Sequence, residues 1–222
     1  MMKNIVIGLG IIAVLLVGSY WFVKKDAGKP HKRLPKYGEI ESVSEKVVDG
    51  KTVLDTLFHT VPDFKFVNQN GDTVSQKNLN GAVYVADFFF TTCPSICKDM
   101  AKQKIRLYQA FKNNPQVKIL SHTVNPEFDS PSVLNAYAKR CKADDANKWI
   151  FVTGDKKQLY DIARTGYLVS ATVGKGDADD FIHTEKFALV DKNKIIRGYY
   201  DGTNPLEVNQ LMYDIEQLLL EK

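Results

Sequence analysis

The chain has 222 residues, of which 44% are hydrophobic and 25% are charged, a composition close to the globular average. This length and composition exclude a disulfide-stapled miniprotein, a collagen-like repeat and a wholly disordered chain, and they fit one sizeable domain plus some non-globular sequence. The net charge is +4, but residues 1–36 hold seven Lys and Arg against one acid, so the remaining 186 residues carry 23 basic and 25 acidic side chains. A nucleic-acid-binding domain is therefore not expected, because the positive charge lies on the amino-terminal tail.

Residues 5–23, IVIGLGIIAVLLVGSYWFV, form an uncharged apolar run of 19 residues. As a helix this run would be about 28 Å long, close to the thickness of the hydrocarbon core of a bilayer. Tyr20, Trp21 and Phe22 stand where an interfacial aromatic belt belongs. We therefore predict an uncleaved transmembrane anchor over residues 1–23. A cleaved signal peptide is the alternative, because small residues near the end of the run offer a cleavage point.

The charges around the apolar run bear on its orientation. Six basic residues follow it within residues 24–36, and only Lys3 with the terminal amine precedes it. The positive-inside rule alone would therefore place the large domain in the cytoplasm. Residues 24–60 are polar, with proline and glycine among them, and are predicted to be a linker. The globular domain is expected over residues 61–222.

The predicted elements of this domain alternate between strands and helices. A hairpin is expected over residues 63–74, because Asn70-Gly71 is a typical turn between two short stretches of strand character. Residues 83–90 are almost continuously apolar, which predicts a buried central strand. Further strands are expected at 117–124, 149–152, 187–190 and 194–199, and helices at 94–113, 131–141, 156–165 and 205–220. This order predicts an α/β domain with a mostly parallel core sheet and a terminal hairpin.

Cys93 and Cys97 carry the most specific chemistry of the sequence. They lie in TTCPSIC (91–97), after the predicted buried strand and where a helix opens, with Pro94 suited to the first helical position. A spacing of four residues places both sulfurs on one helix face, one turn apart. The amino terminus of a helix lowers thiol pKa values, which favours the thiolates that nucleophiles and metal ligands must be. The pair thus suits a disulfide or a soft metal ion, with two ordinary buried cysteines as the plainer alternative.

The surroundings of the pair favour a metal site over thiol–disulfide exchange. The spacing is C-x3-C, whereas thioredoxin-type redox enzymes use C-x2-C. Those enzymes usually also carry a proline just before the strand that faces the dithiol, but residues 181–191 contain no proline and offer His183 there instead. Two thiolates and one imidazole form a ligand set that suits Cu(I), and it also accommodates Cu(II) or Zn(II).

The other histidines and the third cysteine are weaker candidates. His31 lies in the predicted linker and His59 just ahead of the domain, so both are interpreted as solvated side chains. His122 is near the end of a predicted strand and could approach the dithiol, although a satisfied polar residue is the simpler interpretation. Cys141 ends a predicted helix with no second cysteine or histidine nearby in sequence, and it is interpreted as structural.

Three segments together resemble the Sco/SenC family of copper chaperones for cytochrome c oxidase, whose members have a thioredoxin-like fold. The segments are FFTTCPSIC (89–97), TVNPEFDSP (123–131) and DFIH (180–183) with the strand that follows. The resemblance covers about residues 60–222. The cysteine motif and the distant histidine are specific in combination, although neither would be so alone.

The resemblance implies that Cys93, Cys97 and His183 bind copper. It also implies a single membrane anchor with the domain on the outer, periplasmic or equivalent, face, in disagreement with the charge pattern around the apolar run. Lys98 stands where the family commonly has proline, and Asn125 where many members have aspartate. These departures leave the ligands untouched and bear on how a partner docks.

Two functions are considered on this basis. The leading hypothesis is a membrane-anchored metallochaperone, not an enzyme, that passes copper as Cu(I) or Cu(II) to the dinuclear copper site of an oxidase subunit. The alternative is a tethered thiol–disulfide reductase in which Cys93 attacks a disulfide of that subunit and Cys97 resolves it. A reductase has no need of His183. A peroxiredoxin-like enzyme is a third option, but its Pro-x3-Thr-x2-Cys arrangement is absent around Cys93.

Overall fold

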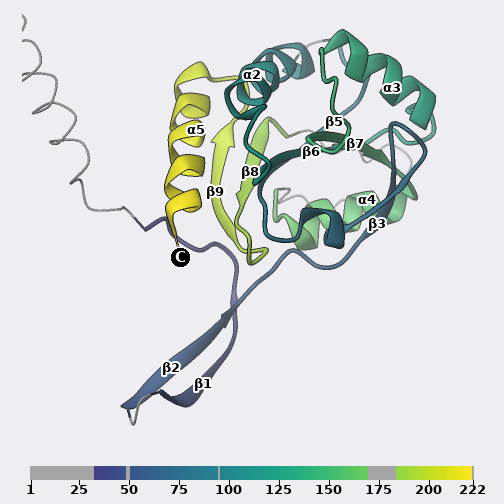
Figure 1. Ribbon diagram of the computed structural model, residues 1–222. Helices are drawn as coiled ribbons and strands as arrows, with labels where there is room; N and C mark the ends of the chain where they lie inside the picture. Colours follow the sequence, from purple (N-terminus) through teal and green to yellow (C-terminus); the bar gives the residue numbers. More distant parts are fainter. Residues whose placement is uncertain (1–32, 49–50, 95, 170–183, 222) are drawn as a thin grey trace, which may run out of the picture. The chain divides into compact units, whose positions relative to one another are not determined.

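The computed structural model describes residues 33–48, 51–94, 96–169 and 184–221, which belong to one compact unit (Figure 1). The predicted anchor over residues 1–23 lies outside the described residues, as does His183. Across the described ranges, no helix has both the length and the apolar character needed to cross a bilayer.

A seven-stranded mixed sheet forms the centre of the domain, in the order β4-β3-β7-β6-β5-β8-β9 (Figure 1). Its strands are β3 (Lys65–Asn68), β4 (Thr73–Ser75), β5 (Val83–Phe89), β6 (Val117–Thr123), β7 (Trp149–Thr153), β8 (Lys186–Val190) and β9 (Ile196–Asp201). The central strands β7, β6 and β5 are parallel, and every other neighbouring pair is antiparallel. The predicted parallel core of the sheet is therefore confined to these three strands, and the predicted terminal hairpin, β8–β9, lies beside them. The outer strands come from the two hairpins β3–β4 and β8–β9, whose short turns reverse the chain.

Helices cover both faces of this sheet, which confirms the predicted α/β class. On one face lie α2 (Ile96–Phe111), α3 (Pro131–Arg140) and α5 (Pro205–Leu220). On the other face lies α4 (Lys156–Asp161), which continues as the π-helical turn η2 (Ile162–Gly166). The 3-10 turn η1 (Gln76–Leu79) adds to this second face.

Strand β5 separates two hydrophobic cores. All of its residues are buried, as predicted for a central strand. Val85 and Phe89 point into the core beneath α2, whereas Ala86 and Phe88 point into the core beneath α4. The chain leaves β5 towards the α2 side, so the cysteine motif that follows belongs to the α2-side core.

A separate antiparallel ribbon precedes the domain sheet. Its strands are β1 (Ile40–Val48) and β2 (Lys51–Phe58), and within the described chain they pair with each other alone. This ribbon lies within the predicted polar linker over residues 24–60, for which no strand was expected. The Asp49-Gly50 pair between its strands is a hairpin signal that the prediction overlooked.

Arg197 on β9 binds two segments from opposite ends of the described chain, one around Leu34 and the other at Glu221. Its guanidinium donates to the carbonyls of Leu34 at 2.7 Å and Pro35 at 2.9 Å. It also binds the carboxylates of Asp191 at 2.9 Å and Glu221 at 2.8 Å. The Arg197 side chain is only 5% exposed, so these bonds are shielded from water.

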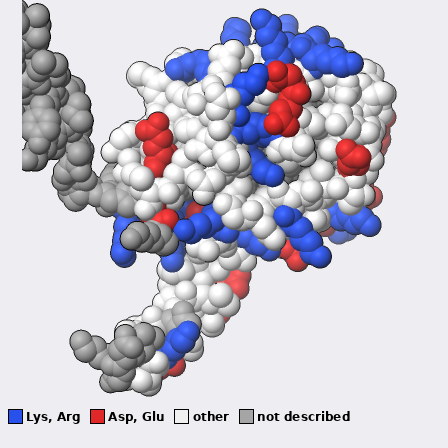
Figure 2. Space-filling model, viewed as in Figure 1, with Lys and Arg blue, Asp and Glu red and all other residues white. Residues whose placement is uncertain are grey.

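On the face shown in Figure 2, basic side chains gather along the upper rim of the domain, and acidic side chains lie among them and lower on the domain. Charges at an exposed surface are screened by solvent and salt. The cysteines of the candidate site are buried.

Candidate metal centre

Cys93 and Cys97 lie at the carboxyl end of β5, where the chain turns into α2. Cys93 sits in the turn, and its amide donates to the carbonyl of Phe90 at 3.2 Å. Cys97 is the second residue of α2, which begins at Ile96. Pro94 lies in the turn, so the prediction that it opens the helix is wrong. The two thiols are nevertheless hydrogen-bonded to each other, as the one-turn spacing was expected to allow.

Both thiols are buried, with 8% of Cys93 and 7% of Cys97 exposed, and neither is in a disulfide. Burial raises the pKa of Cys97 to about 12, and the hydrogen bond with Cys93 adds to this rise. The prediction of a thiol acidified by the helix amino terminus is thus wrong for Cys97, because desolvation outweighs the helix field. At neutral pH Cys97 is a protonated thiol in the metal-free protein.

The turn that carries Cys93 is held by the buried carboxylate of Asp129, which the sequence analysis did not single out. The Thr91 amide donates to Oδ2 of Asp129 at 3.1 Å, and the Thr91 hydroxyl donates to Oδ1. The hydroxyl of Thr123, the last residue of β6, donates to Oδ2 at 2.5 Å. Asp129 is fully buried. One carboxylate therefore joins the ends of β5 and β6 at the sheet edge where the cysteines lie.

The third predicted ligand, His183, lies outside the described residues, and the described chain resumes at Thr184. Strand β8 begins two residues later and runs antiparallel to β5, with Ala86 opposite Ala188. The amino end of β8 therefore lies beside the carboxyl end of β5, at the same sheet edge as the dithiol. Within the described residues, no group of three or more His, Cys, Asp and Glu side chains could hold a metal ion.

His122 faces the opposite side of the sheet from the dithiol. Its ring stacks on Phe88, with 4.8 Å between centroids, and meets Phe64 and Phe66 edge-on. Nδ1 donates to the carbonyl of Asp87 at 3.3 Å, and Nε2 has no hydrogen-bond partner within the part of the chain that the structure describes. Complete burial lowers the pKa of His122 to about 3, so the ring is neutral at physiological pH. His122 is a core residue, although only one of its nitrogens is satisfied.

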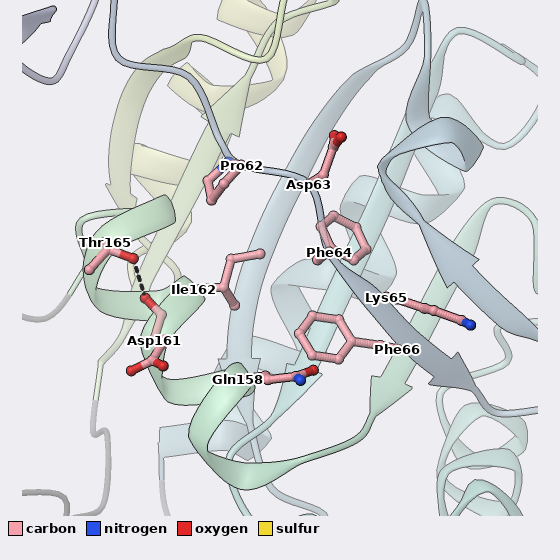
Figure 3. A pocket seen from close by; sticks show the side chains of 9 residues that line it. All are labelled: Pro62, Asp63, Phe64, Lys65, Phe66, Gln158, Asp161, Ile162 and Thr165. Carbon is pink, nitrogen blue, oxygen red and sulfur yellow. Dashed lines mark hydrogen bonds between the residues drawn. The ribbon is translucent and has the colours of Figure 1, made fainter.

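A hollow of about 500 Å³ opens near this aromatic group (Figure 3). Phe64, Phe66 and Ile162 form its apolar wall, and Gln158 and Asp161 lie at its polar side. All three wall residues belong to the core beneath α4, whereas the cysteines belong to the core beneath α2. The hollow is therefore not part of the candidate metal centre.

Cys141 follows α3 as its carboxyl cap and is buried without a disulfide. Its thiol is hydrogen-bonded with Tyr137, and burial raises the pKa of the thiol. This environment agrees with the structural role inferred from sequence. His59 differs from its predicted solvated state, because its Nε2 donates to the Gly166 carbonyl at 2.9 Å. His31 lies outside the described residues.

Comparison with known proteins identifies the family. The family model SCO1/SenC matches residues 54–220 of the chain. The chain belongs to the SCO1/SenC family. One relative of this SCO1/SenC protein is the SCO1 protein homolog of Bacillus subtilis, which is 31% identical over 169 residues, or 75% of this chain and 86% of that protein.

Solved structures of the family share the fold. The protein BsSco, described as a member of the Sco family of cytochrome c oxidase assembly proteins with a disulfide switch, is 29% identical, with a TM-score of 0.61 over 74% of this chain and 95% of that one. ScoI of Bradyrhizobium japonicum, solved with copper bound, is 22% identical, with a TM-score of 0.57 over 72% and 99%, and this likeness concerns the fold alone. The domain thus has the thioredoxin-like fold of the Sco proteins, as the resemblance predicted.

Proposed function

We propose that this protein is a copper metallochaperone that binds copper at Cys93, Cys97 and His183 and passes it to the dinuclear copper site of a cytochrome c oxidase subunit. The observation that carries the proposal is the contact between two buried thiols at the end of β5, with the chain resuming at Thr184 beside that edge. Membership of the SCO1/SenC family, whose resemblance implies copper ligands at these residues, supports the choice of metal. The oxidase-assembly relative supports the choice of partner.

Copper binding at the dithiol exchanges protons for metal. Each thiol releases one proton, and two thiolates with one imidazole then provide a soft ligand set that suits Cu(I). Because burial raises the pKa of Cys97, this thiol gives up its proton only when a soft metal ion binds its sulfur. An ion with three ligands leaves a position open for an incoming sulfur or nitrogen of the receiving protein. Transfer by ligand exchange requires such an open position.

A thiol–disulfide reductase is the less favoured second function. Attack on a disulfide requires a thiolate that is accessible to the partner. The raised pKa of Cys97 leaves it a poor resolving nucleophile at neutral pH, and Cys93 is only 8% exposed. The raised pKa of Cys97 and the burial of Cys93 therefore favour metal binding over thiol–disulfide exchange as the role of this pair.

The proposal includes an uncleaved anchor over residues 1–23 that holds the domain on the outer face of the membrane. The uncharged apolar run of 19 residues and the family resemblance support it, against the charge pattern. After an alkaline wash, the full-length protein should remain in the membrane pellet. A shortened protein in the soluble fraction would show instead that the segment is a cleaved signal peptide.

Anaerobic competition of the full-length chain in detergent against a chromophoric Cu(I) chelator tests the copper site. One Cu(I) should bind per chain, and Cys93→Ser, Cys97→Ser and His183→Ala should each weaken binding. Cys141→Ser is the matched control, because it removes a third buried thiol that lies outside the proposed ligand set. Binding that survives Cys93→Ser unchanged, or that falls equally in Cys141→Ser, would contradict the proposal.

A further inference from the structure

The β1–β2 ribbon exposes an apolar face. Residues directly opposite each other on two paired strands point to the same face, and successive pairs alternate between the two faces. One face therefore carries the pairs Val43–Thr56, Glu45–Leu54 and Val47–Thr52, and we call it the aliphatic face. Val43, Val47 and Leu54 are 54%, 69% and 70% exposed. Glu45 is the single charged residue among the six, so most of this exposed face is apolar or uncharged.

The opposite face of the ribbon is more polar, because it carries Ser44 and the pairs Ser42–Leu57 and Lys46–Val53. An isolated two-stranded ribbon is at best marginally stable in water. An exposed apolar patch usually marks a contact surface. Among the described residues the strands of the ribbon are hydrogen-bonded to each other alone. The aliphatic face therefore fits an apolar surface outside the described domain.

The ribbon leaves the domain at the amino end of β9. Tyr37 pairs with Ile196 at the start of β9, and β1 begins three residues later at Ile40. Beyond β2, the Val61 amide donates to the carbonyl of Lys194, in the turn before β9, at 2.9 Å. From this point the ribbon projects away from the seven-stranded sheet (Figure 1). The chain arriving from the amino terminus and both ends of the ribbon thus meet the domain at one place.

That place is at the opposite end of the sheet from the dithiol. Strand β8 runs antiparallel to β5, with Val190 at its end opposite Tyr84 near the start of β5. The turn from β8 to β9 therefore lies beside the amino end of β5, whereas Cys93 and Cys97 follow its carboxyl end. The seven residues of β5 span about 23 Å. The ribbon and the candidate metal centre are separated by at least this length of strand.

A phospholipid surface fits both the position and the chemistry of the ribbon. The apolar run of the proposed anchor ends at Val23, ten residues ahead of Arg33, where the described chain begins. Even fully extended, ten residues reach at most about 35 Å, so an anchored domain stays close to the bilayer. Residues 24–36 hold six basic side chains against one acid, which complements anionic headgroups. Aliphatic side chains beside such a basic segment gain by entering the interfacial layer of the bilayer.

We propose that the β1–β2 ribbon is a membrane-contact element, whose aliphatic face lies on the phospholipid surface and directs the dithiol edge of the sheet away from the bilayer. This inference rests on the anchor included in the proposed function. It goes beyond that anchor, because a flexible tether alone leaves the domain free to turn. Contact through the ribbon restricts this rotation and keeps Cys93 and Cys97 on the side where the water-exposed part of a partner can reach them.

Tryptophan fluorescence of the full-length chain tests this contact. The chain is reconstituted into vesicles of phosphatidylcholine and phosphatidylglycerol whose acyl chains carry bromine, which quenches only nearby indole rings. Leu54→Trp places a ring on the aliphatic face, and Ser44→Trp is the matched control on the opposite face of the same ribbon. The emission of Trp21 and Trp149 is subtracted with the unmodified chain. Bromine should quench the new ring of Leu54→Trp about twofold or more strongly than that of Ser44→Trp.

The other outcomes separate this inference from the anchor. Both positions are exposed, so neither substitution should change the melting temperature of the domain. Equal quenching at the two positions, with the chain retained in the vesicles after an alkaline wash, would overturn the ribbon contact and leave the anchor standing. A blue-shifted emission of Leu54→Trp without bromine quenching would also overturn it, because the aliphatic face would then pack on protein, such as a second copy of this chain. Loss of the unmodified chain from the vesicles in the alkaline wash would overturn the anchor, and this inference with it.

Discussion

The Asp129 carboxylate accepts hydrogen bonds from both the amide and the hydroxyl of Thr91, two residues ahead of Cys93. The Thr123 hydroxyl donates to the same carboxylate, so the ends of β5 and β6 are held by a single buried anion. Both oxygens of a carboxylate accept hydrogen bonds. An asparagine side chain has only one accepting oxygen, and its NH2 group would face one of these donors. Asp129 therefore sets the backbone from which the first thiol projects.

Asp129→Asn should lower the free energy of unfolding by about 2 kcal/mol, because it replaces charge-assisted hydrogen bonds and leaves buried donors unmatched. Cu(I) affinity should fall in the same variant, since the turn that carries Cys93 loses its anchor. Denaturant unfolding and chelator competition measure the two effects. Asp161→Asn, at a side chain that is 51% exposed, is the control and should change neither. Unaltered copper affinity in a destabilised Asp129→Asn protein would assign Asp129 to folding alone.

Reaction of Cys97 with iodoacetamide should be slow at neutral pH. Burial raises its pKa to about 12, so the reactive thiolate is scarce, and only 7% of the residue is exposed. Under reducing conditions at pH 7.5, peptide mass spectrometry should show alkylation of Cys97 more than about tenfold slower than that of an unhindered cysteine in a short peptide. The rate should climb as the pH is raised through the alkaline range. Alkylation at the rate of the free peptide would show instead that the Cys97 thiol is accessible and that its pKa is not raised, and the argument against a reductase would lose this support.

Protonation of His122 should make the protein less stable in acid. The unfolded chain binds this proton near pH 6.5, whereas the folded chain binds it only near pH 3. Between these values the unfolded state holds more protons, so stability falls as the pH is lowered, and it is unaffected by His122 above about pH 7. From pH 7 to pH 5 the loss should be about 2 kcal/mol.

His122→Leu isolates this contribution from that of the carboxylates. Whatever its stability at pH 7, the variant should lose about 2 kcal/mol less than the unmodified chain between pH 7 and pH 5. Urea unfolding at a series of pH values gives both curves. Parallel curves for the two proteins would show that His122 takes up no proton on unfolding in this range.

Local sequence signals were enough to predict the elements whose formation depends on residues close together in the chain. The helix predicted at 205–220 matches α5, because Asn204 caps it by accepting from the amide of Leu206 and Pro205 suits its first turn. The proximity of Cys93 and Cys97 was also predictable from local sequence. Their separation of four residues keeps the two side chains close even though Cys93 lies in the turn before α2.

Long-range contacts could not be predicted in this manner. Lys104 and Asp87 are 17 residues apart, and Asp129 and Thr91 are 38 apart, so their pairing depends on how α2 and the loop after β6 pack against β5. A charged residue within an amphipathic helix is ordinarily solvent-exposed, and nothing in the sequence pattern marks Lys104 as the exception. The raised pKa of Cys97 was missed for a related reason, because burial is a property of the packed core.

The contacts of Arg197 predict where a soluble form of the domain has to begin. The guanidinium binds the carbonyls of Leu34 and Pro35, and the Leu34 side chain is buried. A form that starts at residue 40 lacks both carbonyls and leaves two donors of a buried cation unmatched, at a cost of about 1–3 kcal/mol for each. It should therefore unfold at a lower temperature than a form covering residues 33–222. Arg197→Met in the longer form should be destabilised at least as strongly, because it also leaves the carboxylate of Asp191 unpaired in the core.

Thermal unfolding of the two forms, monitored by circular dichroism, measures the difference. Arg106→Met in the longer form is the control, because Arg106 bonds Asn209 at the exposed surface, where a lost contact is replaced by water. Trypsin supplies a second measurement, since residues 33–36 contain Arg33 and Lys36. Cleavage after Lys36 should be faster in Arg197→Met than in the unmodified longer form, because the backbone at Leu34 and Pro35 is then released from the sheet. Equal melting temperatures for the forms starting at 33 and 40 would show that the segment contributes nothing to the fold and that Arg197 is satisfied by its carboxylates alone.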